Sequence, residues 1–404
     1  MSDDLGLFRD STENQVHSTG TGRRRARERR PRPRRRGVLI AALIVLVLTV
    51  GAVGYGVREL MALRQVPDYE GAGGAELIVQ IKEGESLSAI GDTLLDRGVV
   101  ASIRAFTQAA EQDRRTRGVQ PGYYQVREQM SGSAAVSALL DPASRVGRLE
   151  IRGGEQLDDV RLPNGTVVPG LLTELSRASC ATVRGQSTCV PSDQLRAAMS
   201  QSDPAALGVP NWVAGPMSRV EAGRRLEGLL VPGTYDVRPG SSAVQLLGQL
   251  SEVSVARLLA SGMPDSAADT GYSPYEVLVI ASIIEREAIT PDFGKVSRVI
   301  YNRLTAGIPL QMDSTINYPL DRQEVRTTGA DRARPGPYNT YLNRGLPASP
   351  IGAPSAAAVQ AAADPDPGPW QYFVKCQRDG TSCFSVTMEE HNVAVRDAVA
   401  RGVF

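Results

Sequence analysis

Two glutamates that follow a long apolar stretch are the residues best suited to chemistry. Residues 273–276, Ser-Pro-Tyr-Glu, form a helix start with an N-cap serine, a proline in the first turn and a glutamate that completes a capping box. The predicted helix is then apolar on almost every face until Glu285 and Glu287, so we expect it to be buried. Helical spacing places Glu285 above Ala281 and Leu278, on a stripe that faces the interior, and Glu287 on a nearly opposite face.

An interior position suits Glu285 to acid catalysis. A carboxyl held among Leu, Ile and Ala side chains loses hydration in its charged form, which favours the protonated form that a general acid requires. The alternative is structural, with Glu285 as the buried ion-pair partner of a cation such as Arg303. The helix alone leaves both interpretations open.

Three turn-rich clusters downstream carry amide, hydroxyl and aromatic side chains, which are common ligands of sugars. The first cluster is residues 301–304 with 310–318. The second is residues 337–341 with 345–347 and 350–351, and the third is residues 372–374 with 384–387 and 390–392. Each cluster is weak evidence by itself, because polar loops are common. Together they favour the catalytic interpretation of Glu285 over the structural one.

Composition excludes several other kinds of site. The chain has 404 residues, enough for two or three domains, and 42% of them are hydrophobic, so most of it can bury a core. Only two histidines occur, His17 and His391, which excludes HExxH motifs, two-histidine zinc sites and imidazole relays. We expect no metal and no other cofactor. Residues 37–404 are net acidic, so no nucleic-acid-binding surface is expected there.

The elements that must position these residues begin with a membrane anchor. Residues 37–57 are 21 residues without a charge, enough for a helix to span about 30 Å of bilayer. Ten arginines in residues 23–36 lie directly before this segment. The positive-inside rule therefore predicts a single-pass helix, with residues 1–36 as a disordered cytoplasmic tail and residues 58–404 on the outer face of the cell membrane.

Four cysteines lie in the predicted external region, in two short pairs. Cys180 and Cys189 flank one predicted hairpin, and Cys376 and Cys383 flank another. Of the three connectivities that four cysteines allow, the sequence favours the local one in an oxidising compartment. Reduced thiols are the alternative, and a zinc site is disfavoured because the spacings are wide and no histidine is near the first pair.

The external region divides into four segments of mixed α+β class. Residues 58–75 contain Pro67 and several glycines and are predicted to be a linker. Residues 76–146 form a small module, residues 147–215 a connecting α/β segment, and residues 216–404 the larger α+β catalytic domain.

The small module has a recognisable pattern over residues 76–126. Strands are predicted at 77–81 and 122–126, and helices at 87–97 and 102–112. This β-α-α-β unit resembles a LysM-type module, whose relatives bind N-acetylated glycans. A small structural subdomain is the alternative.

Taken together, the motifs resemble the endolytic murein transglycosylase family, the YceG-like proteins of bacterial envelopes. The resemblance covers most of residues 37–404 and is carried by ASIIEREA (281–288), YNRL (301–304), LQMDST (310–315), PYNTY (337–341), GLP (345–347) and EHN (390–392). An upstream LEGLLVPGTY (226–235) is similar to the family's EG…PDTY stretch, with Gly233 in place of the usual Asp.

The resemblance implies a function and a mechanism. In that family one glutamate is the catalytic acid/base, and it falls on Glu285. The implied reaction cleaves the β-1,4 bond between N-acetylmuramic acid and N-acetylglucosamine without adding water and leaves a 1,6-anhydro end. One protein carboxyl suffices, unlike the usual pair of a glycosidase. Cutting nascent strands beside the membrane would terminate glycan elongation.

The resemblance also implies supporting residues. The side chains expected to hydrogen-bond the N-acetyl and hydroxyl groups of the glycan are Asn302, Gln311, Thr315, Tyr338 and Asn339. Glu227 and Asp313 are expected to orient Glu285 or a sugar hydroxyl. Peptidoglycan strands are the expected substrate, and glycan polymerases and the cell-elongation machinery are the expected protein partners, by analogy only.

Three rival functions stay open. The first is a non-catalytic envelope scaffold that binds glycan through residues 76–126. The second is a two-carboxylate muramidase-type hydrolase that pairs Glu285 with Asp313 or Glu227. The third is nucleic-acid tethering by the arginine-rich tail, which would be steeply salt-dependent.

Overall fold

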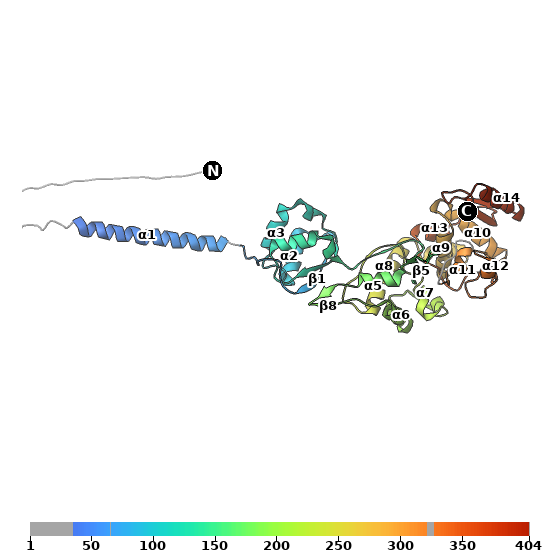
Figure 1. Cartoon of the computed structure of the whole chain (residues 1–404), viewed down its shortest axis with the longest axis horizontal. Helices are drawn as coiled ribbons and strands as arrows, with labels where there is room; N and C mark the ends of the chain where they lie inside the picture. Colours follow the sequence, from blue (N-terminus) through green and yellow to red (C-terminus); the bar gives the residue numbers. More distant parts are fainter. Residues whose placement is uncertain (1–34, 65, 321–326, 404) are drawn as a thin grey trace, which may run out of the picture. The chain divides into compact units, whose positions relative to one another are not determined.

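The computed structural model describes residues 35–64, 66–320 and 327–403 (Figure 1). Residues 1–34 of the predicted tail therefore lie outside the described residues. The chain divides into two units, residues 1–65 and residues 66–404, and each is described by itself.

The described part of the first unit is a single helix, α1 (Arg35–Arg64). Its segment Leu39–Arg58 has a mean hydropathy of 2.4, and none of it is buried by other parts of the protein. Large apolar side chains such as Leu39 and Val53 are about two-thirds exposed (69% and 65%). By length and composition α1 can cross a membrane, and it extends the predicted 37–57 segment at both ends.

The second unit begins with the predicted β-α-α-β module. Strand β1 (Glu76–Ile81), helices α2 (Leu87–Asp96) and α3 (Ile103–Gln112), and strand β2 (Gly122–Arg127) follow in that order. Strand β1 pairs antiparallel with β2, and β3 (Arg145–Val146) adds to the other edge of β2. Helix α4 (Gly132–Leu140) packs against α3 and β2 and completes a separate small core. The order of elements is confirmed, whereas its LysM-like glycan binding stays a prediction.

The rest of the unit is mainly helical. Its helices are α5 (Leu171–Ala178), α6 (Ser192–Gln201), α7 (Asn211–Met217), α8 (Ala243–Ala260), α9 (Pro274–Glu287), α10 (Phe293–Thr305), α11 (Asp313–Asn317), α12 (Gly329–Arg332), α13 (Ala356–Ala363) and α14 (Met388–Ala400). Its strands form antiparallel pairs: β4 (Arg148–Ile151) with β9 (Gly233–Asp236), β5 (Val160–Arg161) with β6 (Val167–Val168), β7 (Thr182–Val183) with β8 (Gln186–Ser187), and β10 (Tyr372–Lys375) with β11 (Ser382–Ser385). The α+β class is thus confirmed.

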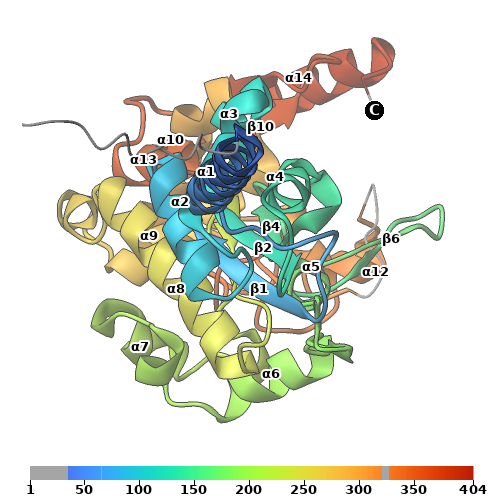
Figure 2. The same cartoon turned by 90° about the vertical axis from the view of Figure 1, so that its left-hand side faces the viewer.

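Helix α9 lies in the centre of the larger core. Ser273 caps it, with the predicted capping box: the Ser273 hydroxyl accepts from the Glu276 N–H, and the Glu276 carboxylate accepts from the Ser273 N–H. Every residue from 277 to 284 is buried, as the apolar sequence predicts. Helices α10 and α13 pack against α9 and against each other (Figure 2). The core thereby fixes the helix that ends in Glu285.

Two disulfides close short hairpins in this region. Cys180 bonds Cys189, and Cys376 bonds Cys383. This is the local connectivity that the sequence favours. The first hairpin also contacts the small module, because the Arg184 N–H donates to the Glu76 carbonyl over 3.0 Å.

Candidate active site

Glu285 is half-buried in the last turn of α9, where the helix leaves the core. Its Oε2 accepts two hydrogen bonds from Ser355, one from the backbone N–H over 3.0 Å and one from the hydroxyl over 2.5 Å. Ser355 is the N-cap of α13. The carboxyl thus lies at the positive end of a neighbouring helix rather than in a wholly apolar pocket.

The other carboxyl oxygen lies against the chain that follows β4. A Cβ atom at Gly153 would overlap Glu285 Oε1, so the position accepts glycine alone without a shift. The Gly154 N–H donates to the Ala353 carbonyl, and the Ala353 N–H donates to the Glu155 carbonyl, both over 2.8 Å. These bonds join the segments on either side of Glu285.

Glu285 does not form the alternative ion pair with Arg303. The Arg303 guanidinium donates to the carbonyls of Pro309 and Gln371 and to Oε1 of Gln311. Within the described residues no bond joins it to Glu285. The alternative in which Glu285 is the buried ion-pair partner of Arg303 is therefore wrong.

The neighbours of Glu285 on α9 extend the polar surroundings. Arg286 Nη1 donates to the Gly154 carbonyl over 2.9 Å, and its Nε is buried with no partner among the described residues. Burial lowers the pKa of Arg286. Glu287 accepts from the Ser314 N–H over 3.0 Å, at the start of α11.

Glu227 is a second carboxyl, 3% exposed, between α7 and β9. Its Oε2 accepts from the Tyr318 hydroxyl over 2.8 Å and from the Leu157 N–H over 3.3 Å. Burial raises the pKa of Glu227 to about 7, against the opposing effects of these two bonds and of Arg224. Glu227 therefore titrates near neutral pH.

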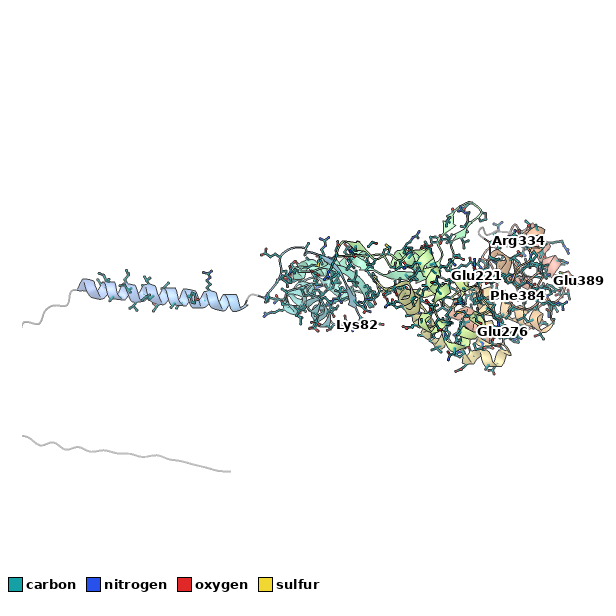
Figure 3. The ribbon with its side chains drawn as sticks, turned by 90° about the horizontal axis from the view of Figure 1, so that it is seen from below. Lys82, Glu221, Glu276, Arg334, Phe384 and Glu389 are labelled. Carbon is teal, nitrogen blue, oxygen red and sulfur yellow. A yellow bond between two sulfur atoms is a disulfide. The ribbon has the colours of Figure 1, made fainter. Side chains whose placement is uncertain are left out.

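One open cleft borders the residues that contact Glu227, and a second cleft adjoins it. One of about 820 Å³ is lined by residues 156–159, by α6, and by Glu221, Arg224 and Tyr318. A second of about 230 Å³, which shares Pro319 and Leu320 with the first, reaches Arg334 and Asn339; Figure 3 labels Glu221 and Arg334.

A further cleft of about 420 Å³ is lined by Gly153, Gly154 and Glu155. The next residues along the chain, 156–159, line the 820 Å³ cleft, so consecutive parts of one segment border the two clefts. Gly153 contacts Glu285 and Leu157 contacts Glu227. Segment 153–159 therefore contacts both carboxyls and borders both clefts.

Four predicted sugar ligands hold loops of the protein. Asn302 donates to the carbonyls of Gly368 and Trp370, and the buried Thr315 bonds the Met312 carbonyl and the Thr340 hydroxyl. Tyr338 and Asn339 are 7% and 4% exposed. The Tyr338 hydroxyl pairs with Ser349, and Asn339 donates to the Arg332 and Arg334 carbonyls.

Gln311 and Asp313 are more accessible. Gln311 is exposed and has a left-handed backbone, φ 55°, which is uncommon for a residue with a Cβ. Its Oε1 accepts from Arg303 over 2.6 Å. The half-buried Asp313 accepts from Tyr341 and Thr327 and pairs with Arg332.

The site also contains residues that the sequence did not single out. Gly153 and Ser355 contact Glu285, and Tyr318 and Arg224 surround Glu227. Ser355 had one available signal, since Pro-Ser before a run of alanines is typical of a helix start. In the described part of the chain, no group of three or more His, Cys, Asp or Glu side chains is placed to hold a metal ion.

Comparison with known proteins identifies relatives along most of the chain. A protein named endolytic murein transglycosylase from Bacillus subtilis (strain 168) is 27% identical over 319 residues, which are 78% of this chain and 83% of the relative. One of the same name from Streptococcus pneumoniae serotype 2 is 26% identical over 347 residues, 80% of this chain and 58% of the relative. A crystal structure of a putative yceG-like protein from Listeria monocytogenes has a TM-score of 0.49 at 24% identity and covers 79% of this chain and 98% of its own.

A family model settles the assignment. The model of the YceG-like family matches residues 79–397. This range runs from β1 to α14 and contains Glu285, Ser355 and Glu227. The chain therefore belongs to the YceG-like family.

Proposed function

We propose that the chain is an endolytic murein transglycosylase that cleaves the β-1,4 bond between N-acetylmuramic acid and N-acetylglucosamine, with Glu285 as its general acid/base. The observation that carries this proposal is the Glu285 carboxyl, which is held by Ser355 and lies against Gly153, a residue that lines an open cleft. The names of the Bacillus and Streptococcus relatives support the substrate class.

The proposed reaction needs only one protein carboxyl. Glu285 protonates the bridging oxygen, and the bond to C1 of the muramoyl unit breaks. As carboxylate it then takes the proton of the C6 hydroxyl of the same unit, which attacks C1 and closes the 1,6-anhydro ring. The substrate's acetamido group stabilises C1 between these steps. No water enters, so a second carboxylate to activate one is unnecessary.

Other residues are proposed to shape the groove. Gln311 and Asp313 are accessible enough to contact sugar hydroxyl groups directly. The loop bonds of Asn302, Thr315 and Asn339 support an indirect role for them, in which they fix the walls. Glu227 is buried, has a pKa of about 7, and accepts a hydrogen bond from the Tyr318 hydroxyl. Since Tyr318 lines the 820 Å³ cleft, these observations support a role for Glu227 in positioning Tyr318 there.

The proposed location is the outer face of the cell membrane. Helix α1 would anchor the chain, and the ten arginines of residues 23–36 would keep the N-terminus in the cytoplasm. Residues 66–404 would then act on nascent glycan next to its site of synthesis, end strand elongation, and meet the glycan polymerases there.

Analysis of the products of the full chain in detergent tests this function. Purified peptidoglycan is incubated with wild type, Glu285→Gln and the exposed control Glu252→Gln, and the released fragments are examined by mass spectrometry. We expect 1,6-anhydro ends from wild type and control, and a loss of at least about a thousandfold in Glu285→Gln. Full activity of Glu285→Gln would exclude the assigned role, and fragments with reducing ends would favour the two-carboxylate hydrolase.

A further inference from the structure

The two oxygens of the Glu285 carboxyl have different surroundings. Oε2 accepts both a backbone N–H and a hydroxyl from Ser355, over 3.0 and 2.5 Å. Oε1 faces the bare Cα of Gly153, beside the cleft that Gly153 and Gly154 line. One oxygen is therefore anchored, and the other faces the chain that borders open space.

We propose that Ser355 is a positioning residue that holds Glu285 through Oε2 and so reserves Oε1 for proton transfer to and from the glycan. This inference rests on the proposed function. A backbone N–H can only donate, so the oxygen that accepts it is a poor place for the acidic proton. The proton of the acid form therefore resides on Oε1, passes from there to the bridging oxygen, and is replaced by the proton of the C6 hydroxyl.

The surrounding fold keeps Ser355 in place. Ser355 has the extended backbone of an N-cap, and its hydroxyl oxygen accepts from the Ala358 N–H over 3.3 Å. Helix α13 packs against α9, and the bonds of Ala353 to Gly154 and Glu155 fix the chain just before Ser355. Helix α13 consists of Ala, Val and Gln only, so its N-terminal dipole is the feature that it offers to the carboxylate.

The position of the Glu285 carboxyl also explains why residue 153, which lines the cleft, is a glycine. A side chain there would push Oε1 away while Ser355 holds Oε2, so the carboxyl would have to rotate and lose its bonds. Ser355 and Gly153 thus act on the same carboxyl from opposite sides. Glu285 is left with one productive orientation.

The test removes the hydroxyl and keeps the N–H. Ser355→Gly is chosen because glycine is almost as good an N-cap as serine, so α13 loses little stability. We expect kcat on peptidoglycan to fall about tenfold with KM unchanged, because a hydrogen bond to a charged acceptor is lost but substrate contacts remain. The kcat of Ser355→Ala should fall at least as far as that of Ser355→Gly. The Ser355→Thr variant, which keeps a hydroxyl, should retain most of the wild-type kcat.

Two controls separate positioning from stability and from the proposed function. Ser242→Gly makes the same change at the N-cap of α8, and it should retain wild-type kcat. In a Glu285→Gln background, Ser355→Gly should reduce the residual rate no further. If Ser355→Gly has the kcat of wild type while Glu285→Gln is inactive, the role of Ser355 is overturned and the proposed function is not. If Glu285→Gln is active, the proposed function itself is overturned.

Discussion

Replacing Glu227 by glutamine should change how the stability of the protein depends on pH. Glu227 is 3% exposed, and burial raises its pKa from the ordinary 4.5 to about 7. The folded protein therefore holds the proton of Glu227 more tightly than the unfolded chain does. Its stabilising contribution is complete below pH 4.5 and is lost as the pH rises to 7, because the unfolded chain ionises first.

The size of the effect follows from the same two pKa values. A rise from 4.5 to about 7 corresponds to about 3 kcal/mol in the free energy of unfolding. Glutamine does not titrate and can still accept from the Tyr318 hydroxyl. We therefore expect the variant to lack this loss. The free energy of unfolding of the variant minus that of wild type should then increase by about 3 kcal/mol between pH 4.5 and a pH above 7.

Urea unfolding of the full chain in detergent, followed by tryptophan fluorescence at several pH values between 4.5 and 8, measures this difference. The exposed Glu252→Gln is the matched control and should follow wild type at every pH. Parallel curves for wild type and Glu227→Gln would refute the reasoning, since they would mean that Glu227 is not kept protonated by its burial.

Three further changes have definite expected outcomes. Gly153→Ala should lower kcat about a hundredfold because the new Cβ displaces Glu285 Oε1, while Gly118→Ala, whose Cβ meets open space, should not; a turnover assay on peptidoglycan compares them. Replacing Cys180 and Cys189 together by serine should lower the free energy of unfolding by about 2–3 kcal/mol, read from urea curves; unchanged curves would show that the bond is dispensable. Deleting residues 35–64 should move the protein from the membrane fraction to the soluble fraction on centrifugation, and persistent sedimentation would point to another attachment.

Local elements could be predicted because local signals encode them. The capping box at Ser273 and the unbroken apolar run predicted a buried α9, and the alternation of strand and helix patterns predicted the β-α-α-β module. Glu285 was singled out by the same logic, as an acid on an otherwise apolar helix. Its real surroundings are more polar than predicted, because α9 leaves the core in its last turn.

The partners of Glu285 could not be predicted in this way. Ser355 is 70 positions away along the chain, and Gly153 belongs to a segment with no chemical motif. Only the packing of α13 on α9, and the backbone bonds between residues 154 and 353, bring them together. A single sequence has no signal for such long-range pairs.

Residue type was also ambiguous for the polar clusters. The amides of Asn302 and Asn339 suit sugar hydroxyl groups, but they suit backbone carbonyls equally well, and the structure gives them backbone partners. Tyr318 lies in a predicted cluster but was not chosen, because nothing in the sequence connects it to Glu227, 91 residues earlier. Their proposed roles toward the glycan stay predictions.

Cleavage of peptidoglycan in ¹⁸O-labelled water tests the central claim most directly. If Glu285 acts alone as acid and then base, the new ends carry no label, are anhydro-terminated, and disappear in Glu285→Gln. Labelled reducing ends would contradict this, because they would require an activated water and a second carboxylate.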